Sequence, residues 1–281
     1  MKKLQHILLV AGLLLAGATC VMAQVPQANI RYVRQEKSDG TGGKYTNDGK
    51  SWATAKNNIQ DAINDLIENG LEGEVWVAAG TYTPTESTES AGGSTLYMSF
   101  KIPAGITVRG GFKPDLNEDY DGIDNNTTRP RHDFNSIGWF YQYYTILSGD
   151  LSATKAEFAW DSKKNVWNPT FYGNSYHVVW FAMNGFDANG RANGLPKPAM
   201  VEGCVIEDGH AYNNSLNERK HNAYGGGAYM VANSTMQNCY FRNCDASRDG
   251  GAVYMDGGGM LIHAYISDSQ ALGVGVEFGY G

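Results

Sequence analysis

Four charged residues in one short stretch have the types that acid–base catalysis requires. Arg242, Asp245, Arg248 and Asp249 alternate in sign along this stretch. A base and an acid held at one turn can move a proton to and from a substrate. We take these four residues as the catalytic candidates. The alternative, which we favour, is that the charges only hydrate an exposed turn.

A second stretch has part of the spacing of a calcium-binding loop. Asn117, Asp119 and Asp121 place oxygen ligands at positions 1, 3 and 5, and a glycine follows at position 6. Position 12 is Thr128 instead of the bidentate glutamate, although Asp124 offers one more oxygen. We therefore expect that the protein requires no cofactor. For these residues two alternatives are left, a calcium-binding loop and a plain acidic turn.

Aromatic side chains gather in the long segments between the strand-like stretches. The ligand-binding candidates are Trp139, Tyr141, Tyr143, Trp160 and Trp167. An aromatic ring beside polar groups can pack flat against the apolar face of a sugar. The alternative is that these rings only seal the loops onto the body of the protein.

Other catalytic motifs are absent from the sequence. The chain has no Gly-x-Ser-x-Gly turn, no phosphate-binding loop and no His-Glu-x-x-His. His177 lies in the apolar stretch 175–179, where we favour a hydrogen-bonded structural histidine over a general base.

A repeat positions the residues of the last third of the chain. The stretch 225–230, Gly-Gly-Gly-Ala-Tyr-Met, returns at 250–255 as Gly-Gly-Ala-Val-Tyr-Met, and the stretch 236–243 returns at 261–268. Both shifts are about 25 residues, a length typical of one unit in a solenoid protein. An earlier copy at 201–208 lies further upstream, because the polar, Asn-rich stretch 212–222 is inserted after it.

Apolar and polar residues alternate within each copy, which is the period of a strand with one buried face. Short strands and glycine turns in such a repeat predict a parallel β-helix, whose equivalent side chains form ladders about 4.8 Å apart. The expected ladders are Cys204–Cys239–Ala264 and, at a turn, Asp208–Asn243–Asp268.

One amphipathic helix precedes the repeats. Its apolar face consists of Ile59, Ala62, Ile63, Leu66 and Ile67. The helix is predicted over about 57–69, with Asn57 or Asn58 as the N-cap and Gly70 just past its end. We expect it to cover the open end of the β-helix, where apolar interior and strand edges would otherwise be exposed.

Several stretches in a fixed order resemble one family. They are Ser51-Trp52-Ala53-Thr54-Ala55, Val75–Tyr82, Ile106–Phe112, Thr145–Asp150, Asn174–Val179 and Phe241-Arg242-Asn243-Cys244. With the glycine repeats, they resemble the secreted surface proteins of Bacteroidetes and other bacteria with a pectin-lyase-like fold, and the repeats of chlamydial polymorphic outer-membrane proteins. The resemblance covers nearly all of residues 29–281. It implies an all-β fold, a right-handed parallel β-helix with an N-terminal capping α-helix.

Pectin-lyase-like folds include polysaccharide lyases, so the resemblance also implies an alternative in which the protein is an enzyme. In those lyases calcium neutralises a uronate, and an arginine or lysine removes the neighbouring proton. That role would fall to Arg242 or Arg248. The aspartate pair and Gly-His-Gly of polygalacturonase-like hydrolases are missing, since Asp208-Gly209-His210 is only a fragment of that pattern.

The N-terminus predicts export. Residues 1–23 contain two lysines, an apolar run and Val-Met-Ala before Gln24, the pattern of a cleaved secretory signal peptide. We expect residues 24–281 to form one domain at the cell surface or outer membrane or outside the cell. That part has 20 basic and 29 acidic residues and no further transmembrane segment, and its negative charge argues against nucleic acid as a partner.

Three cysteines follow the signal peptide, an odd number without metal-binding spacing. We expect Cys204 and Cys239 to be small buried residues, with a disulfide between turns as the alternative. Residues 273–281 read as the start of a further turn without a cap. We therefore expect the chain to be incomplete and to lack a C-terminal anchor or sorting domain.

Three functions stay open. The first is adhesin-like, non-catalytic binding of a glycan or another cell-surface ligand through the loop-lined flank. The second is a calcium-assisted polysaccharide lyase or other polysaccharide-degrading enzyme. The third is a structural spacer.

Overall fold

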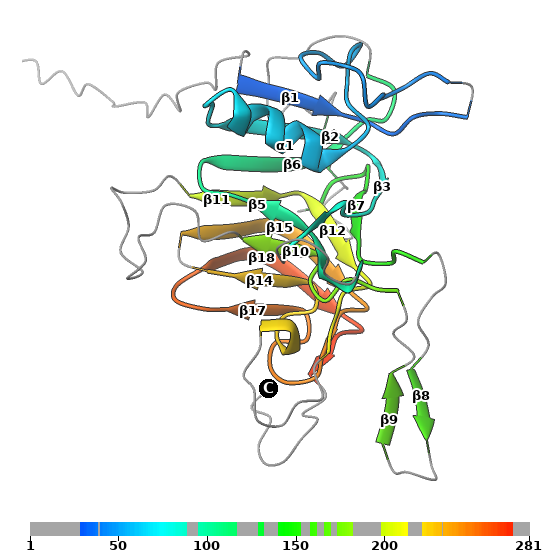
Figure 1. Cartoon of the computed structure of the whole chain (residues 1–281), viewed down its shortest axis with the longest axis vertical. Helices are drawn as coiled ribbons and strands as arrows, with labels where there is room; N and C mark the ends of the chain where they lie inside the picture. Colours follow the sequence, from blue (N-terminus) through cyan, green and yellow to red (C-terminus); the bar gives the residue numbers. More distant parts are fainter. Residues whose placement is uncertain are drawn as a thin grey trace, which may run out of the picture.

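A computed structural model describes residues 29–38, 40–88, 95–116, 129–131, 140–152, 158–161, 166–169, 173–181, 198–212, 221–231 and 233–271. Within these ranges the protein is mostly β, with parallel sheets and one short α-helix (Figure 1). The helix is α1 (Ile59–Glu68), and two 3₁₀ turns cover Thr95–Tyr97 and His221–Ala223.

Most strands are short. They are β1 (Ile30–Val33), β2 (Gly73–Ala78), β3 (Gly80–Tyr82), β4 (Glu86–Ser87), β5 (Met98–Ile102), β6 (Ile106–Phe112), β7 (Thr145–Ser148), β8 (Phe158–Asp161), β9 (Val166–Pro169), β10 (Val179–Phe181), β11 (Ala199–Glu202), β12 (Cys204–Glu207), β13 (His210–Ala211), β14 (Ala228–Met230), β15 (Ser234–Arg242), β16 (Asp245–Ala246), β17 (Val253–Met255), β18 (Met260–Ser267) and β19 (Gln270–Ala271).

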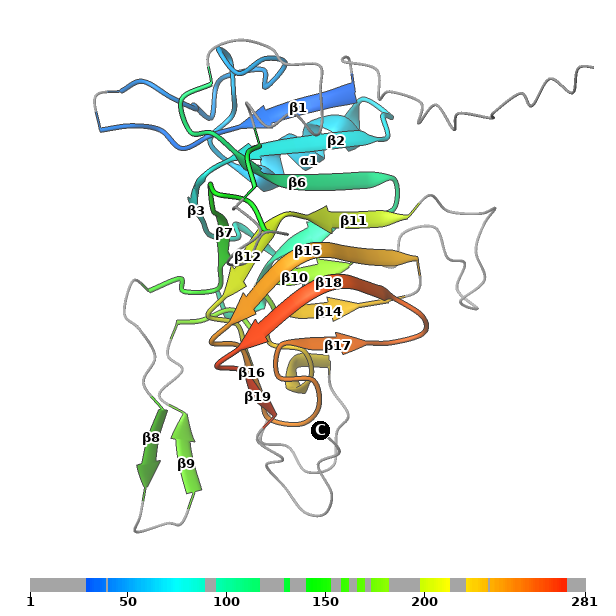
Figure 2. The ribbon, with the colours of Figure 1, turned by 180° about the vertical axis from the view of Figure 1, so that it is seen from behind.

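The described strands form four sheets. A nine-stranded parallel sheet runs β1-β2-β6-β11-β15-β12-β7-β3, with β18 added to β15, and it curls into a half-barrel (Figure 2). A second sheet has the order β17-β14-β10-β5-β4, and a third has the order β13-β16-β19. β8 and β9 pair with each other as an antiparallel hairpin.

The sequence repeat sets the register of strand pairing, because paired residues lie one repeat apart. Ala228 pairs with Val253, Thr235 with Met260, and Asp245 with Gln270, each pair in a different sheet and each joining equivalent positions of successive repeats. The longer shift of the earlier copy is present too, because Val201 pairs with Met236. The chain therefore passes through the three parallel sheets in the same order twice, from β14 to β16 and from β17 to β19.

Two columns of residues in the left-handed region bend the chain at the same places in each repeat. In the first column, Gly203, Asn238 and His263 have φ of 73°, 51° and 49°. Glycine and asparagine enter this region at low steric cost. The predicted turn ladder is the other column: Asp208, Asn243 and Asp268 have φ of 60°, 50° and 47°.

The turn ladder is held by its own side chains. Asn243 Nδ2 donates a hydrogen bond to Asp208 Oδ1, and Asn174 Nδ2 donates to the Asp208 carbonyl oxygen at 3.1 Å. The amide groups therefore bind both a carboxylate and a backbone oxygen.

The inward side chains of the strands form one apolar core. It contains Val75, Val108, Val201, Met236 and Phe241, and the side of α1 that carries Ile59, Ile63 and Leu66 packs into the same core. The expected cysteine ladder lies there, since Cys239 pairs with Ala264 and the same register places Cys204 beside Cys239. Cys204 and Cys239 are free and buried, as predicted, and so is Cys244.

The predicted helix is confirmed, with closer bounds. Asn58 is the N-cap, and its Oδ1 accepts from the backbone N–H groups of Gln60 (2.8 Å) and Asp61 (3.2 Å). The helix packs against β1, β2 and β5 at the β1 side of the nine-stranded sheet (Figure 1). Ile67, expected on the apolar face, is instead exposed.

We predict that the three described cysteines resist alkylation in the folded protein. Burial raises the pKa of Cys239 to about 12 and places that of Cys204 well above its usual value, and the thiolate is the reactive form. Iodoacetamide at pH 8 followed by peptide mass analysis should find Cys204, Cys239 and Cys244 labelled only after addition of guanidinium. Native labelling, or a disulfide between Cys204 and Cys239, would contradict this packing.

Candidate functional site

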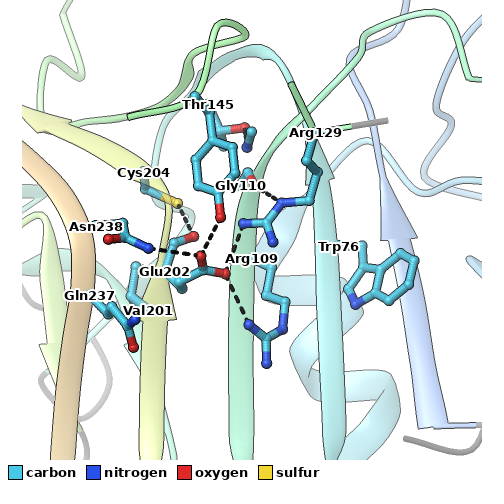
Figure 3. Close-up of polar contacts among 12 residues, drawn as sticks. Trp76, Arg109, Gly110, Arg129, Thr145, Val201, Glu202, Cys204, Gln237 and Asn238 are labelled. Atoms are coloured by element: carbon cyan, nitrogen blue, oxygen red, sulfur yellow. Dashed lines mark hydrogen bonds and ion pairs between the residues drawn. The ribbon is translucent and has the colours of Figure 1, made fainter. Parts of the chain in front are cut away.

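A buried charge network lies on the outer face of the nine-stranded sheet, beside the bend at Gly203. Its centre is Glu202, the last residue of β11, which pairs in register with Arg109 of β6. Arg129 and Tyr141 come from the segment between β6 and β7 and reach the same carboxylate. Figure 3 shows Arg109 and Arg129 pointing at Glu202 from one side and Asn238 from the other.

Both oxygens of Glu202 are fully occupied. Oε1 accepts from the Tyr141 hydroxyl at 2.6 Å and from Asn238 Nδ2 at 3.3 Å. Oε2 accepts from Arg109 Nη1 at 2.9 Å and from Arg129 Nη2 at 2.8 Å. Arg109 also binds Glu74 of β2, through Nε at 2.8 Å and Nη2 at 3.0 Å. Two arginines thus balance two glutamates.

The surroundings of Glu202 fix its ionisation. Burial alone would raise the pKa of Glu202, but the charges of Arg129 and Arg109 and the hydrogen bond from Tyr141 outweigh it and lower the pKa to about 2. The Arg129 side chain is fully buried, and its pairing with Glu202 offsets the cost of burying its charge. The network has no oxygen left for a substrate, and its role is to hold the segment around Arg129 and Tyr141 on the sheet.

Tyr141, one of the ligand-binding candidates, is part of this anchor. Its ring is fully buried, with the Arg129 guanidinium 4.2 Å and the Arg131 guanidinium 5.0 Å from the ring centre. A Cβ at Gly203 or at Gly111 would lie 2.6 Å from atoms of this ring, so glycine is required at both positions. Tyr143 is half-buried in the adjoining turn.

A row of aromatic rings continues from this anchor along the outer face of the sheet. We call Tyr144, Phe140, Tyr240 and Tyr265 the aromatic strip. Phe140 lies 5.6 Å from Tyr144 and 6.5 Å from Tyr240, and Tyr240 lies 5.1 Å from Tyr265, all between ring centres. Phe140 is buried, whereas Tyr144 is 38% and Tyr265 49% exposed.

A polar row runs beside the aromatic strip, two positions after Tyr240 on β15 and after Tyr265 on β18. We call Ser148, Glu207, Arg242 and Ser267 the polar column, because they pair in register across β7, β12, β15 and β18. Arg242 binds Glu207 Oε2 through Nε at 2.6 Å and Nη2 at 2.5 Å. The Ser267 and Tyr240 hydroxyls are 3.0 Å apart, so the two rows are connected.

The ring geometry of the strip suits an apolar surface of a ligand. Tyr240 meets Phe140 at 87° and Tyr265 at 68°, so these rings touch edge to face and do not cover each other by stacking. A second aromatic row, on β10, β14 and β17, differs: Trp180 and Tyr229 stack at 21°, and Tyr229 and Tyr254 lie at 36°. Its rings cover one another's faces.

The four catalytic candidates do not converge. Arg242 is bound to Glu207, while Asp245 is buried in β16, with Oδ2 3.1 Å from His210 Nδ1 of the neighbouring strand β13. Arg248 and Asp249 are half-buried, and their backbone groups bind the segment 223–225. Arg242 and Asp245 therefore have separate partners, Glu207 and His210.

Several predicted site residues lie outside the described residues. These are Trp139 and the calcium candidates Asn117, Asp119, Asp121 and Asp124. Trp160 and Trp167 pair with each other in the β8–β9 hairpin, of which the backbone alone is described. In the described part of the chain, no group of three or more His, Cys, Asp or Glu is arranged to hold a metal ion, and no helix is long and apolar enough to span a membrane.

His177 has the structural role predicted for it. Its side chain is buried, and Nδ1 lies 2.9 Å from the Gly225 carbonyl oxygen.

No family model, curated protein or solved structure matches this chain.

Sequence reasoning named Arg242 as a catalytic candidate but missed the tyrosines and the other polar residues beside it on the outer face. Tyr240 and Tyr265 occupy equivalent positions of successive repeats, and Arg242 and Ser267 follow two positions later. Projecting the repeat onto ladders would have found this row. Glu202 had no such signal, because its partners Arg129 and Tyr141 are far from it in the sequence.

We predict that Glu202 makes the protein sensitive to acid. The pKa of Glu202 is about 2 in the folded protein against 4.5 for a free glutamate, so its contribution is complete above pH 4.5 and is lost as the pH falls towards 2. Its size is about 3 kcal/mol. In urea unfolding at pH 7, Glu202→Gln should be about 3 kcal/mol less stable than the wild type. Between pH 7 and pH 3, the variant should lose less stability than the wild type loses.

Glu207→Gln is the matched control, since it removes the same charge from an ion pair that is partly exposed. Its stability at pH 7 should change by about 1 kcal/mol or less. An acid sensitivity of Glu202→Gln equal to that of the wild type would show that other carboxylates dominate.

Proposed function

We propose that the protein is an exported, non-catalytic right-handed parallel β-helix protein that binds a glycan of a cell surface or matrix. The ligand would lie on the aromatic strip and the polar column. The repeat register shared by three parallel sheets supports the β-helix, and the sequence resemblance supports its pectin-lyase-like form. Residues 1–23, the proposed signal peptide, support export.

One observation carries the binding proposal: half-exposed ring faces stand directly beside a row of hydroxyl and charged groups. Sugars have an apolar face that packs on aromatic rings and hydroxyl groups that bind polar side chains. Tyr240 and Tyr265 supply the rings, while Glu207, Arg242 and Ser267 supply the polar partners. Both rows cross successive strands, so they form a surface suited to a chain.

The position of Arg242 keeps a lyase as the second candidate. This arginine lies beside the aromatic strip, with its guanidinium 5.9 Å from the ring centre of Tyr240. A proton-abstracting arginine must face the substrate, whereas Arg242 donates through Nε and Nη2 to the Glu207 carboxylate. The Arg242–Glu207 ion pair therefore favours glycan binding over the elimination reaction of a lyase. A structural spacer would need neither the exposed rings nor the polar column.

We predict that glycan binding depends on the aromatic strip and not on the second aromatic row, which lies on β10, β14 and β17. The purified protein should be retained by at least one polysaccharide in affinity electrophoresis with calcium present. Tyr265→Ala and Tyr240→Ala should each weaken that binding about tenfold, because each removes about 1.4 kcal/mol of ring contact.

Tyr254→Ala is the matched control. It removes a half-buried tyrosine from the same repeat as Tyr265, but from the stacked row. It should leave affinity within about twofold of the wild type, with thermal melting used to check that every variant is folded. Equal losses in Tyr254→Ala and Tyr265→Ala would argue against the strip as the site. Unsaturated uronate products, detected by absorbance and abolished in Arg242→Ala, would establish the lyase instead.

A further inference from the structure

The charges of the polar column are balanced before any ligand arrives. Arg242 is the one cation among the residues of the strip and column, and both of its ion-pair contacts go to Glu207 Oε2. Glu207 is 15% exposed in its side chain, against 39% for Arg242, so the carboxylate is the more deeply placed partner. The pair presents no net charge to a ligand.

The residues that flank the column add negative charge. Asp208 follows Glu207 and Asp268 follows Ser267 in the turn ladder, where Asn243 separates them. The whole chain carries a formal charge of −7. A uronate or sulfate laid along the column would therefore meet carboxylates on its polar side.

An anionic ligand would also have to share Arg242 with Glu207. Carboxylate and sulfate oxygens only accept hydrogen bonds, so they need donors. The charged donor of the column, Arg242, already faces the Glu207 carboxylate, so an anion bound to its remaining N–H groups would lie close to a second negative charge.

Neutral sugars fit the same groups without this cost. A hydroxyl group both donates and accepts. Both contacts of Glu207 with Arg242 use Oε2, so Oε1 can accept a sugar hydroxyl while the ion pair stays intact. The hydroxyls of Ser148 and Ser267 lie in the same row.

We propose that the ligand of the strip is a neutral glycan chain, selected against acidic glycans by the Arg242–Glu207 pair, and that it runs along the stacking direction of β7, β12, β15 and β18. This inference rests on the proposed glycan-binding function. Because Tyr240 and Tyr265 stand on adjacent strands about 4.8 Å apart, successive sugar units meet successive rings. Binding should therefore strengthen with chain length.

The test compares the wild type with Glu207→Gln on four soluble polymers. A mixed-linkage β-glucan and an arabinoxylan are the neutral probes, and polygalacturonate and alginate are the acidic ones. The wild type should bind a neutral polymer at least tenfold more tightly than either acidic one, with little change between low and high salt. Glu207→Gln releases Arg242 and should gain at least fivefold affinity for an acidic polymer, and this gain should vanish in high salt.

Glu86→Gln is the control for overall charge. Glu86 pairs with Lys101 at 3.4 Å on β4 and β5, and its replacement removes one negative charge away from the strip. It should not raise affinity for acidic polymers. Melting curves confirm that both variants are folded.

The outcomes separate the two proposals. Tighter wild-type binding to an acidic polymer, lost in Tyr265→Ala, would overturn neutral selectivity while the binding function stands. An unchanged preference in Glu207→Gln would show that the ion pair does not set selectivity. Retention by none of the four polymers would overturn both proposals.

Discussion

Parallel stacking in register is the constraint on which the rest of this structure depends. Each paired side chain in β15 has its own equivalent from the next repeat, in β18, as its neighbour. Inward positions must therefore form apolar columns, as Met236 with Leu261 and Phe241 with Ile266 do. Backbone bends must coincide as well, which explains why residues with positive φ recur at Asn238 and His263. One column that failed to match would disturb the hydrogen bonds of two strands at once.

The outer face of the nine-stranded sheet is covered in stages. Next to β1 and β2, Trp52 packs between Tyr32 and Phe112 and closes a second small core. In the middle, the Glu202 network holds the segment that carries Arg129 and Tyr141. Burying four charged groups is costly, and here each charge has an opposite partner, so the network fixes where the segment lies. Beyond it, Tyr240 of β15 meets the Phe140 ring, and Tyr265 of β18 is 49% exposed.

The sequence predicted the repeated architecture well because that architecture is local. The repeat shift, the cysteine ladder and the helix capped by Asn58 all follow from periods and caps that can be read within a short stretch of sequence. The candidate site was less predictable. The long aromatic segments drew attention, yet Tyr141 is an anchor, and Arg242 and Asp245 have different partners. Arg242 and Asp245 meet Glu207 and His210 at the repeat shift of 35 residues, so projecting the repeat would have found both pairs. The contact between Tyr141 and Glu202 joins distant parts of the chain outside the repeat, which periodicity does not encode.

Each repeat contains two tyrosines that lie in different sheets, and the local packing gives the two resulting rows of rings different geometries. Tyr229 and Tyr254 belong to short strands, where Tyr229 stacks on Trp180 at 21° and meets Tyr254 at a tilt of 36°. Tyr240 and Tyr265 lie further along the same repeats, where Phe140, brought in by the anchored segment, meets Tyr240 edge-on. Because Phe140 belongs to the same segment as Tyr141, the Glu202 network sets the start of the aromatic strip. A buried charge cluster centred on Glu202 thereby shapes the exposed surface that we propose as the glycan-binding site.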